Sequence, residues 1–359
     1  MTFLSYAQNY EDVLLFRALN HVKQGFYVDV GAHDPIVDSV TKAFSERGWR
    51  GINIEPVEAT FRKLQEDRPD DINLQVVVGA WEGDVSFFEV VGTGLSTCDE
   101  TLAHWQAHEY GAEVREVLMK QCTLDRLCEP YGLHEIHFMK VDVEGAELGV
   151  FKGFGLKNVR PWIILVEAIN PRDRQLTHHL WEHCILPKSY HYVYFDGINR
   201  YYVADEHREL DAAFESPPNL WDDFERLQQH NLRLQIGMLE AVLASANKRC
   251  SRGLIELPNW EGVVKSARRS IVLAKLAAKR IPKFVISHAA AFVKVHPGVK
   301  AGIDRLLRPF PAFRSRAKEV VRRGTSQPSK SGIDRLTPRA ARAYYDLRQE
   351  IELAGREEG

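Results

Sequence analysis

Two carboxylates in the N-terminal half of the chain lie where short apolar runs end. The run FYVDV contains Asp29 and leads directly into Gly31, and the run GINIEP contains Glu55. A glycine lets the backbone approach a ligand closely, and an acid after the second strand of a parallel sheet accepts hydrogen bonds from ribose hydroxyls. The two runs together predict a site for a nucleoside-containing ligand. The alternatives are a polar strand end for Asp29 and a helix cap for Glu55.

The loop after the first run lacks the G-x-G-x-x-G pattern that holds a dinucleotide pyrophosphate, because AHDP follows Gly31. One glycine combined with an acid after the second strand is typical of sites for S-adenosylmethionine rather than NAD. Small residues after the third run leave room for a flat base. The predicted methyl-donor site comprises Asp29, Gly31, Ala32, His33, Asp34, Glu55, Pro56, Gly79 and Ala80.

Further polar residues follow two later apolar runs. Because the carboxyl ends of parallel strands meet at one edge of a sheet, we expect these residues beside the donor site. The run FMKVDVEGAE supplies Lys140, Asp142, Glu144 and Glu147, and WIILVEAINP supplies Glu167 and Asn170.

The elements that must position these residues alternate between apolar runs and charged stretches compatible with helices. Strand-length runs occur at 26–30, 51–56, 72–80, 84–90, 136–145, 162–168 and 190–203. Near-continuous apolar runs suit strands buried on both faces, and the alternation predicts an α/β fold with a mostly parallel sheet. The DGIN turn within the last run predicts an antiparallel hairpin at the sheet edge. The insert at 91–121 is either a lid or substrate loop, or a surface helix after a glycine-rich turn.

The bulk composition indicates an ordinary protein of 359 residues with a formal net charge of −2. Its length favours two domains. The five cysteines are scattered and never spaced as C-x-x-C, which predicts a reducing compartment and no zinc site. The N-terminal residues lack a basic leader, and no window approaches the length of a membrane span. We therefore expect a cytoplasmic location.

The C-terminal part is organised differently from the rest. Residues 1–215 are predicted to form the α/β domain, 216–250 a long amphipathic helix, and 324–359 a linker with a terminal helix. The helix either packs on its own domain or forms a coiled-coil homodimer through 225–245. Between 251 and 323 lies a predicted basic amphipathic helical tail, in which sixteen Lys and Arg residues over 264–323 are opposed only by Asp304 and Glu319.

The basic tail suits an anionic membrane surface, which would place the protein peripherally at the inner face of the membrane. A protein partner or plain solvated helices are the alternatives. The few aromatic residues and the lack of a recognised nucleic-acid fold predict no nucleic-acid partner.

Several of these segments together resemble the FkbM family of S-adenosylmethionine-dependent O-methyltransferases, over roughly residues 5–205. The segments are SYAQNYEDVLL, YVDVGAHDP, GINIEPVEATFRKL, LSTCDETL, CTLDRL and FMKVDVEGAELGVFKGF. The chain departs from the family where Asp34 and Pro35 replace a frequent second glycine. The resemblance implies a Rossmann-like class I methyltransferase fold. Such a fold has a seven-stranded, mostly parallel sheet with helices on both faces, here followed by a C-terminal helical extension.

The family resemblance also implies methylation of a hydroxyl, in bacteria most often of a sugar in a polysaccharide or glycolipid. The alternatives are an O-methyltransferase for a small specialised metabolite and a non-catalytic scaffold. An unactivated hydroxyl needs a base near the methyl group, and the predicted catalytic residues are Asp142, His179 and Glu144. The alternatives are an orienting role for Asp142 and Glu144 and an ordinary surface histidine.

The site is predicted to work without a metal. The alternative is a magnesium ion held by oxygen atoms of Asp142, Glu167 and Asn170, which would lower the pKa of the acceptor hydroxyl.

Overall fold

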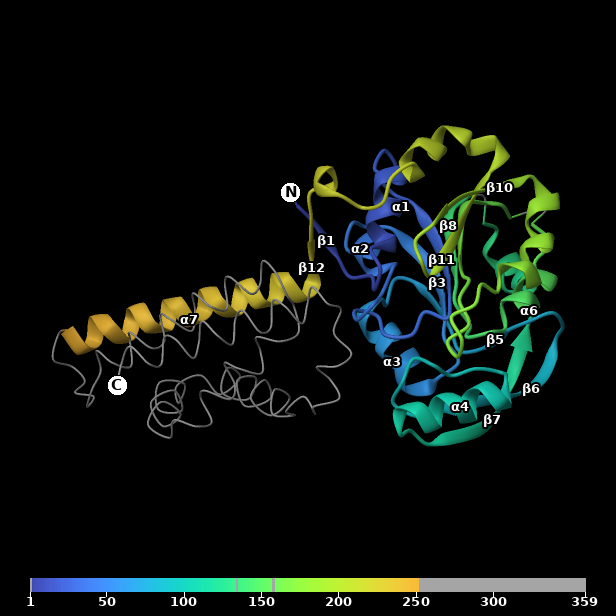
Figure 1. Ribbon diagram of the computed structural model, residues 1–359, viewed down its shortest axis with the longest axis horizontal. Helices are drawn as coiled ribbons and strands as arrows, with labels where there is room; N and C mark the ends of the chain where they lie inside the picture. The colour runs from blue at the N-terminus through green and yellow to red at the C-terminus, as the bar shows by residue number, and fades with distance from the viewer. Residues whose placement is uncertain (1, 134, 157–158, 252–359) are drawn as a thin grey trace. The chain divides into compact units, whose positions relative to one another are not determined.

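The computed structural model describes residues 2–133, 135–156 and 159–251 (Figure 1). The first compact unit spans Met1–Leu227 and contains every strand given below. In the described part of the second unit, the helix α7 (Leu227–Ser251) occupies most of the segment predicted as a long helix. The predicted basic tail, the linker and the terminal helix lie outside the described residues.

The main sheet of the first unit has seven strands in the order β10-β11-β9-β8-β2-β3-β4. The five strands from β9 to β4 are mutually parallel, β11 is antiparallel to β9, and β10 is antiparallel to β11. The sheet is therefore mixed, with β11 as the reversed strand. The bounds are β2 (Phe26–Val30), β3 (Arg50–Ile54), β4 (Ile72–Leu74), β8 (Ile136–Val141), β9 (Pro161–Glu167), β10 (Tyr190–Phe195) and β11 (Asn199–Ala204).

The predicted α/β class and the edge hairpin are present, but two predicted strands were assigned wrongly. The run at 72–80 divides into β4 and β5 (Val77–Val78), and the run at 84–90 forms β6 (Gly83–Val90) outside the main sheet. In a separate sheet, β6 pairs antiparallel and β5 pairs parallel with β7 (Val114–Cys122). The pairing of β6 with β7 joins segments that are separated in the sequence by the turn and helix of the insert, so local periodicity could not reveal it.

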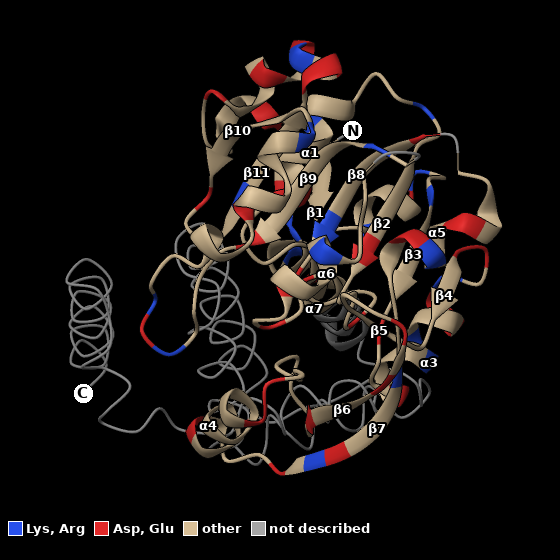
Figure 2. Cartoon of the chain, turned by 90° about the vertical axis from the view of Figure 1, so that its right-hand side faces the viewer, with Lys and Arg blue, Asp and Glu red and all other residues tan. Residues whose placement is uncertain are grey.

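The insert contains the predicted turn and helix and also a strand that neither alternative included, while a role as a lid or substrate loop stays a prediction. It forms a turn, then the helix α4 (Glu100–Tyr110), then β7. The Asp99 side chain caps α4 by accepting a hydrogen bond from the backbone N–H of Leu102. Figure 2 shows charges of both signs along β7, whereas the central strands β2, β3 and β8 are mainly uncharged. The two sheets therefore differ in character, with a buried main sheet and a small sheet that carries charge.

Alternation along the central strands places apolar side chains on both faces of the main sheet. Tyr27 packs in one core with α1 (Glu11–Leu19), α2 (Lys42–Ser45) and the 3-10 segment η5 (Asp205–Phe214). Val28 and Val30 pack in the other core, with α5 (Leu124–Cys128), α6 (Glu147–Lys152) and η3 (Glu182–Cys184). Such two-sided coverage leaves the ends of the strands as the place for a site.

The remaining elements are short, apart from α3. The helix α3 (Glu58–Asp67) connects β3 to β4. The other 3-10 turns are η1 (Glu129–Tyr131), η2 (His178–Leu180), η4 (Leu186–Lys188) and η6 (Leu220–Asp222).

The N-terminal segment is tied to the end of the first unit. The strand β1 (Phe3–Ser5) pairs in parallel with β12 (Phe224–Arg226). The Arg17 guanidinium forms an ion pair with Asp222 at 2.7 Å. Asp12 accepts hydrogen bonds from the Ser5 hydroxyl at 2.8 Å and the Tyr6 N–H at 2.7 Å. Through these contacts the first unit extends to Leu227, beyond residue 215, where the predicted α/β domain ended.

No helix within the described ranges is both long and apolar enough to span a bilayer.

Candidate functional site

A cavity of about 290 Å³ lies at the carboxyl ends of the central strands. Its volume is close to the lower end of ligand pockets, about 300–1,000 Å³. Loops that follow β2, β3 and β8 supply much of its lining, and the 37–40 segment and the insert supply more. Ligands of open parallel sheets bind at this edge.

The glycine turn after β2 brings these loops into contact. Gly31 has a φ of +83°, and a Cβ at this position would lie 1.8 Å from the backbone oxygen of Asp142. The N–H groups of Gly31 and Ala32 donate to the Ile54 oxygen at 3.0 and 3.1 Å. Glycine is therefore required at position 31 because the loops after β2 and β8 meet there.

Glu55 at the end of β3 organises the same turn. Its side chain is buried, and its two carboxylate oxygens accept hydrogen bonds from the N–H groups of His33 and Val57, both at 2.8 Å. Burial raises the pKa of Glu55, while these backbone bonds oppose the rise. Each carboxylate oxygen can accept a second bond, so Glu55 retains capacity for the hydroxyl groups of a ligand.

Asp29 belongs to a buried polar row that crosses the sheet. Asp29 on β2 is in register with Asn53 on β3 and Lys140 on β8. Its Oδ2 accepts a hydrogen bond from the Thr41 hydroxyl at 2.8 Å. Its buried Oδ1 has no hydrogen-bond partner within the described part of the chain, and lies 3.9 Å from Lys140 Nζ.

The charge state of Asp29 depends on its neighbours. Burial raises the pKa of Asp29, and Lys140, Thr41 and Arg68 oppose this rise. Because Asp29 lines the cavity and its Oδ1 makes no hydrogen bond within the described residues, it could accept a hydrogen bond from a cationic group of a ligand.

Part of the cavity lining is apolar. This part includes Ile54, Phe87, Leu95 and residues 76–78. A flat aromatic ring would fit such a wall, while the polar groups at the strand ends would fix its orientation.

A cluster of three carboxylates forms the acidic part of the site. One oxygen from each of Asp142, Glu144 and Glu167 lies within 4.8 Å of the others. Lys140 Nζ lies 3.0 Å from Asp142 Oδ2, and the Gln106 amide donates to Glu144 Oε2 at 3.1 Å. The three carboxylates lie at the ends of β8 and β9, and α4 supplies Gln106, which contacts Glu144.

The two glutamate carboxyl groups of the acidic cluster hold protons more strongly than usual. Burial and the neighbouring charge of Asp142 raise the pKa of Glu144 to about 8 and raise the pKa of Glu167 well above its ordinary value. Burial also raises the pKa of the adjacent Glu147 to about 7. Groups of this kind can accept a proton near neutral pH, and the same oxygen atoms could hold a divalent cation.

Six of the nine residues predicted to bind the donor line the cavity: Asp29, Gly31, Ala32, His33, Glu55 and Pro56. The other three are placed elsewhere. Asp34 Oδ1 accepts bonds from the N–H groups of Ile36 and Val37, both at 3.0 Å, and its Oδ2 lies 3.0 Å from Lys63 Nζ.

Gly79 and Ala80 also lie outside the cavity lining. The Gly79 N–H donates to the Cys122 oxygen at 3.0 Å, and a Cβ on Gly79 would lie 2.3 Å from the Gln121 side chain. A donor-binding role for Asp34, Gly79 and Ala80 stays a prediction.

Among the predicted catalytic residues, Asp142 and Glu144 line the cavity. His179 lies exposed on η2 and is not part of the lining, so its catalytic role stays a prediction. Asn170, the third ligand of the magnesium alternative, accepts the N–H of Arg172 through Oδ1 at 2.9 Å.

Sequence reasoning missed part of the lining. Gln8, the 37–40 segment and Cys98 were not singled out, and residues 93–96 were recognised only as part of the insert. Gln8 reaches the cavity because Ala7 forms a bridge with Asp38, a contact between distant segments. Its position in the segment SYAQNYEDVLL was the only signal available from the sequence.

Comparison with known proteins indicates the family of the α/β domain. The model of the methyltransferase FkbM domain matches residues 29–207. Among solved structures, a match is the crystal structure of methyltransferase FkbM from Methylobacillus flagellatus KT, with 13% sequence identity and a TM-score of 0.32. This match covers 50% of the present chain and 43% of that chain. No curated protein matches.

Proposed function

Because the chain carries a methyltransferase domain of the FkbM family, we propose that it transfers a methyl group from S-adenosylmethionine to a hydroxyl oxygen. The observation that carries this proposal is the meeting of two different groups of residues in one cavity. Asp29, Gly31 and Glu55 form one group, and Asp142 and Glu144 form the other. The first group suits a donor, and the second suits the proton of an acceptor.

The residues present fit the proposed donor. The Oδ1 of Asp29, which makes no hydrogen bond within the described residues, suits the donor's ammonium group. The free acceptor capacity of Glu55 suits ribose hydroxyls, and the apolar wall around Phe87 suits adenine. When bound, S-adenosylmethionine supplies an electrophilic methyl group on a sulfonium, which is an excellent leaving group.

The residues of the chain position the acceptor and remove its proton. A hydroxyl with an ordinary high pKa reacts slowly unless a base takes its proton as the new bond forms. Glu144 lines the cavity with a pKa of about 8 and is the proposed base. Asp142, held at 3.0 Å by Lys140, orients the acceptor hydroxyl.

We further propose that the acceptor is a sugar hydroxyl of a bacterial polysaccharide or glycolipid, as the family resemblance implies. The full-length protein should be incubated with methyl-labelled donor and glycans from a strain that lacks the gene. The expected result is label in a glycan fraction and a mass gain of one methylene group per site. Glycans from the parent strain are the matched control, because their sites are already methylated.

Two outcomes of this experiment favour other functions. Label found only in small specialised metabolites would contradict the glycan acceptor. If neither glycans nor metabolites accept label, the enzyme proposal fails and a non-catalytic scaffold is favoured.

We also propose that the segment 251–323 holds the protein at an anionic membrane surface on the cytoplasmic side. Its clustered positive charge in the sequence supports this proposal. Flotation of the full chain with anionic but not neutral liposomes is expected, with loss of flotation when Lys279, Arg280 and Lys283 are changed to glutamate. Equal flotation of this variant would contradict the proposal. A homodimer through residues 225–245 likewise stays a proposal, which sedimentation of the full chain tests.

A further inference from the structure

The residue that ends α3 is a buried arginine. The Arg68 side chain is 1% exposed, and its backbone N–H donates to the Leu64 oxygen at 2.8 Å. Within the described residues, the carboxylate within 4 Å of Arg68 is that of Asp67, whose Oδ2 lies 3.7 Å from Nε. Arg68 Nε itself makes no hydrogen bond to the described residues. Burial of a charge without a directly bonded counterion is unfavourable, so the guanidinium requires an explanation.

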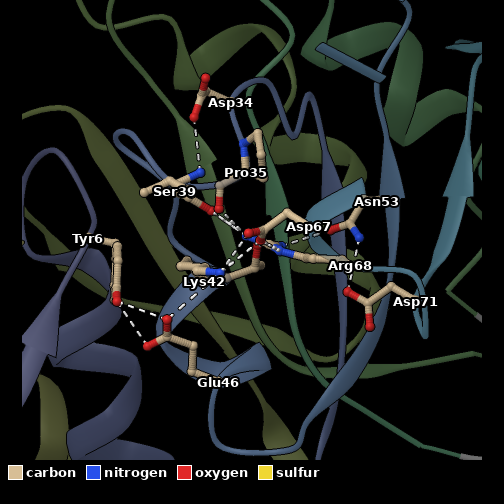
Figure 3. A network of polar contacts seen from close by, with 12 residues as sticks. Tyr6, Asp34, Pro35, Ser39, Lys42, Glu46, Asn53, Asp67, Arg68 and Asp71 are labelled. Atoms are coloured by element: carbon tan, nitrogen blue, oxygen red, sulfur yellow. Dashed lines mark hydrogen bonds and ion pairs between the residues drawn. The ribbon is translucent and has the colours of Figure 1, made fainter. Parts of the chain in front are cut away.

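The Arg68 guanidinium donates hydrogen bonds to the loop at residues 35–41. Arg68 Nη2 donates to the Pro35 backbone oxygen and to the Ser39 hydroxyl, both at 2.8 Å. Arg68 Nη1 donates to the Thr41 hydroxyl at 2.5 Å. Figure 3 shows Arg68 among Pro35, Ser39 and Asn53. These contacts reach three positions of the 35–41 segment, called the wall loop below.

The wall loop forms one side of the cavity. Residues 37–40 line it, whereas Arg68 does not. The loop has no regular secondary structure beyond a bridge between Asp38 and Ala7. Asp34 accepts the N–H groups of Ile36 and Val37 at the start of the loop, and Arg68, which offers donors in a rigid planar fork, anchors Pro35, Ser39 and Thr41.

In addition to the wall loop, Arg68 is connected by hydrogen bonds to Asp29. The Thr41 hydroxyl has a single proton, and it accepts a bond from Arg68 Nη1 while it donates to Asp29 Oδ2 at 2.8 Å. Arg68 Nη1 also donates to Asn53 Oδ1 at 3.2 Å, next to Asp29 in the polar row. The positive charge of Arg68 thus acts on Asp29 through one hydroxyl group.

We propose that Arg68 is a positioning residue for the donor site: it fixes the wall loop and, through Thr41, orients the Asp29 carboxylate toward the donor. This inference rests on the proposed function, because it assumes that S-adenosylmethionine binds in this cavity. Thr41 is the link in the path, and Ser39 anchors only the loop.

The test compares Arg68→Met, Arg68→Lys and Thr41→Val in the full-length protein. Calorimetry gives the Kd for S-adenosylmethionine, and initial rates separate the donor KM from kcat and from the acceptor KM. Arg68→Met is expected to weaken donor binding about tenfold or more, because the loop and Asp29 both lose their partner. Arg68→Lys keeps the charge and should recover part of the affinity. Thr41→Val should weaken donor binding several-fold while it leaves the acceptor KM unchanged.

Arg47→Met is the matched control. Arg47 is an exposed residue whose guanidinium packs over the ring of Phe3 at 4.5 Å and donates to the Ala43 oxygen at 2.8 Å, outside the cavity lining. This control should lower thermal stability without changing the donor Kd. A purely structural role for Arg68 would give the same pattern.

The inference is overturned if folded Arg68→Met, or Thr41→Val, binds the donor with wild-type affinity. Should Arg68→Met fail to fold, Thr41→Val decides alone, because valine preserves the shape of threonine. Failure of the wild-type protein to bind the donor is a different result, which overturns the proposed function and this inference with it.

Discussion

Asp29 on β2 and Lys140 on β8 face each other across two adjacent parallel strands, with Oδ1 and Nζ 3.9 Å apart. Lys140 Nζ also lies 3.0 Å from Asp142 Oδ2 and 3.3 Å from the Gly31 oxygen. One ammonium group therefore lies between the proposed donor carboxylate and the acidic cluster. The neighbouring carboxylates raise the pKa of Lys140, so it stays charged at neutral pH. Lys140 thereby fixes the position of Asp29 relative to Asp142, that is, of the donor half of the proposed site relative to the acidic half.

The proposed base predicts how the reaction rate depends on pH. With a pKa of about 8, Glu144 is mostly protonated at pH 6 and becomes able to accept a proton as the pH rises. The methyl-transfer rate should therefore increase with pH, with a midpoint near 8. Glu144→Gln should lower kcat by about 100-fold or more and abolish this rise.

Glu147→Gln is the matched control for the base, because Glu147 lies nearby but not in the cavity lining. It should retain the alkaline rise. Wild-type kcat in folded Glu144→Gln would show that another group takes the proton.

Metal removal tests the other possible use of the acidic cluster. Glu144, with a pKa of about 8, is mostly protonated at neutral pH, and burial raises the pKa of Glu167 well above its ordinary value. Lys140 also forms an ion pair with Asp142, so the chain itself offsets much of the negative charge of the acidic cluster. We expect methyl transfer to survive dialysis against EDTA and not to increase when Mg²⁺ is added. Loss of activity on dialysis with recovery on addition of Mg²⁺ would assign Asp142, Glu144 and Glu167 to a cation site.

Glu11, at the start of α1, predicts how stability depends on pH. Burial raises its pKa from 4.5 to about 7. The folded protein therefore binds more protons than the unfolded chain between these values, and the contribution of Glu11 to stability is lost as the pH rises through about 7. The full change is about 3 kcal/mol.

Urea unfolding at pH 5 and pH 8, followed by fluorescence of the buried Trp49 and Trp181, measures this change. Glu11→Gln should reduce the loss of stability between the two pH values. Glu66→Gln, exposed on α3, should leave the loss as in the wild type. An unchanged loss in Glu11→Gln would contradict the assignment.

Local sequence patterns were sufficient to predict the central strands β2 and β3 and the acidic residues in and after them. The apolar runs that contain Asp29 and Glu55 predicted β2, β3 and the acids that now line the cavity, because strand burial on both faces leaves a clear signal in the sequence. Pro56, which was predicted to bind the donor, also lines the cavity, and its donor-binding role stays a prediction.

Contacts between distant segments could not be predicted in the same way. The pairing of β6 with β7 placed the run at 84–90 in a separate sheet, and the bridge from Ala7 to Asp38 brought Gln8 to the cavity. The role of Arg68 was also hidden, because a charged residue at the end of a helix resembles any surface arginine in the sequence. Its partners Pro35, Ser39 and Thr41 become visible only in three dimensions.

Isothermal titration of the full-length protein with S-adenosylmethionine tests the central claim most directly. The account predicts saturable binding of one donor per chain. Asp29→Asn should weaken it about tenfold or more, because a charge-assisted hydrogen bond at a buried site is lost. Asp70→Asn, at an exposed position, should bind as the wild type does. Absence of saturable binding, or wild-type affinity in a folded Asp29→Asn protein, would contradict the claim that this cavity holds the methyl donor.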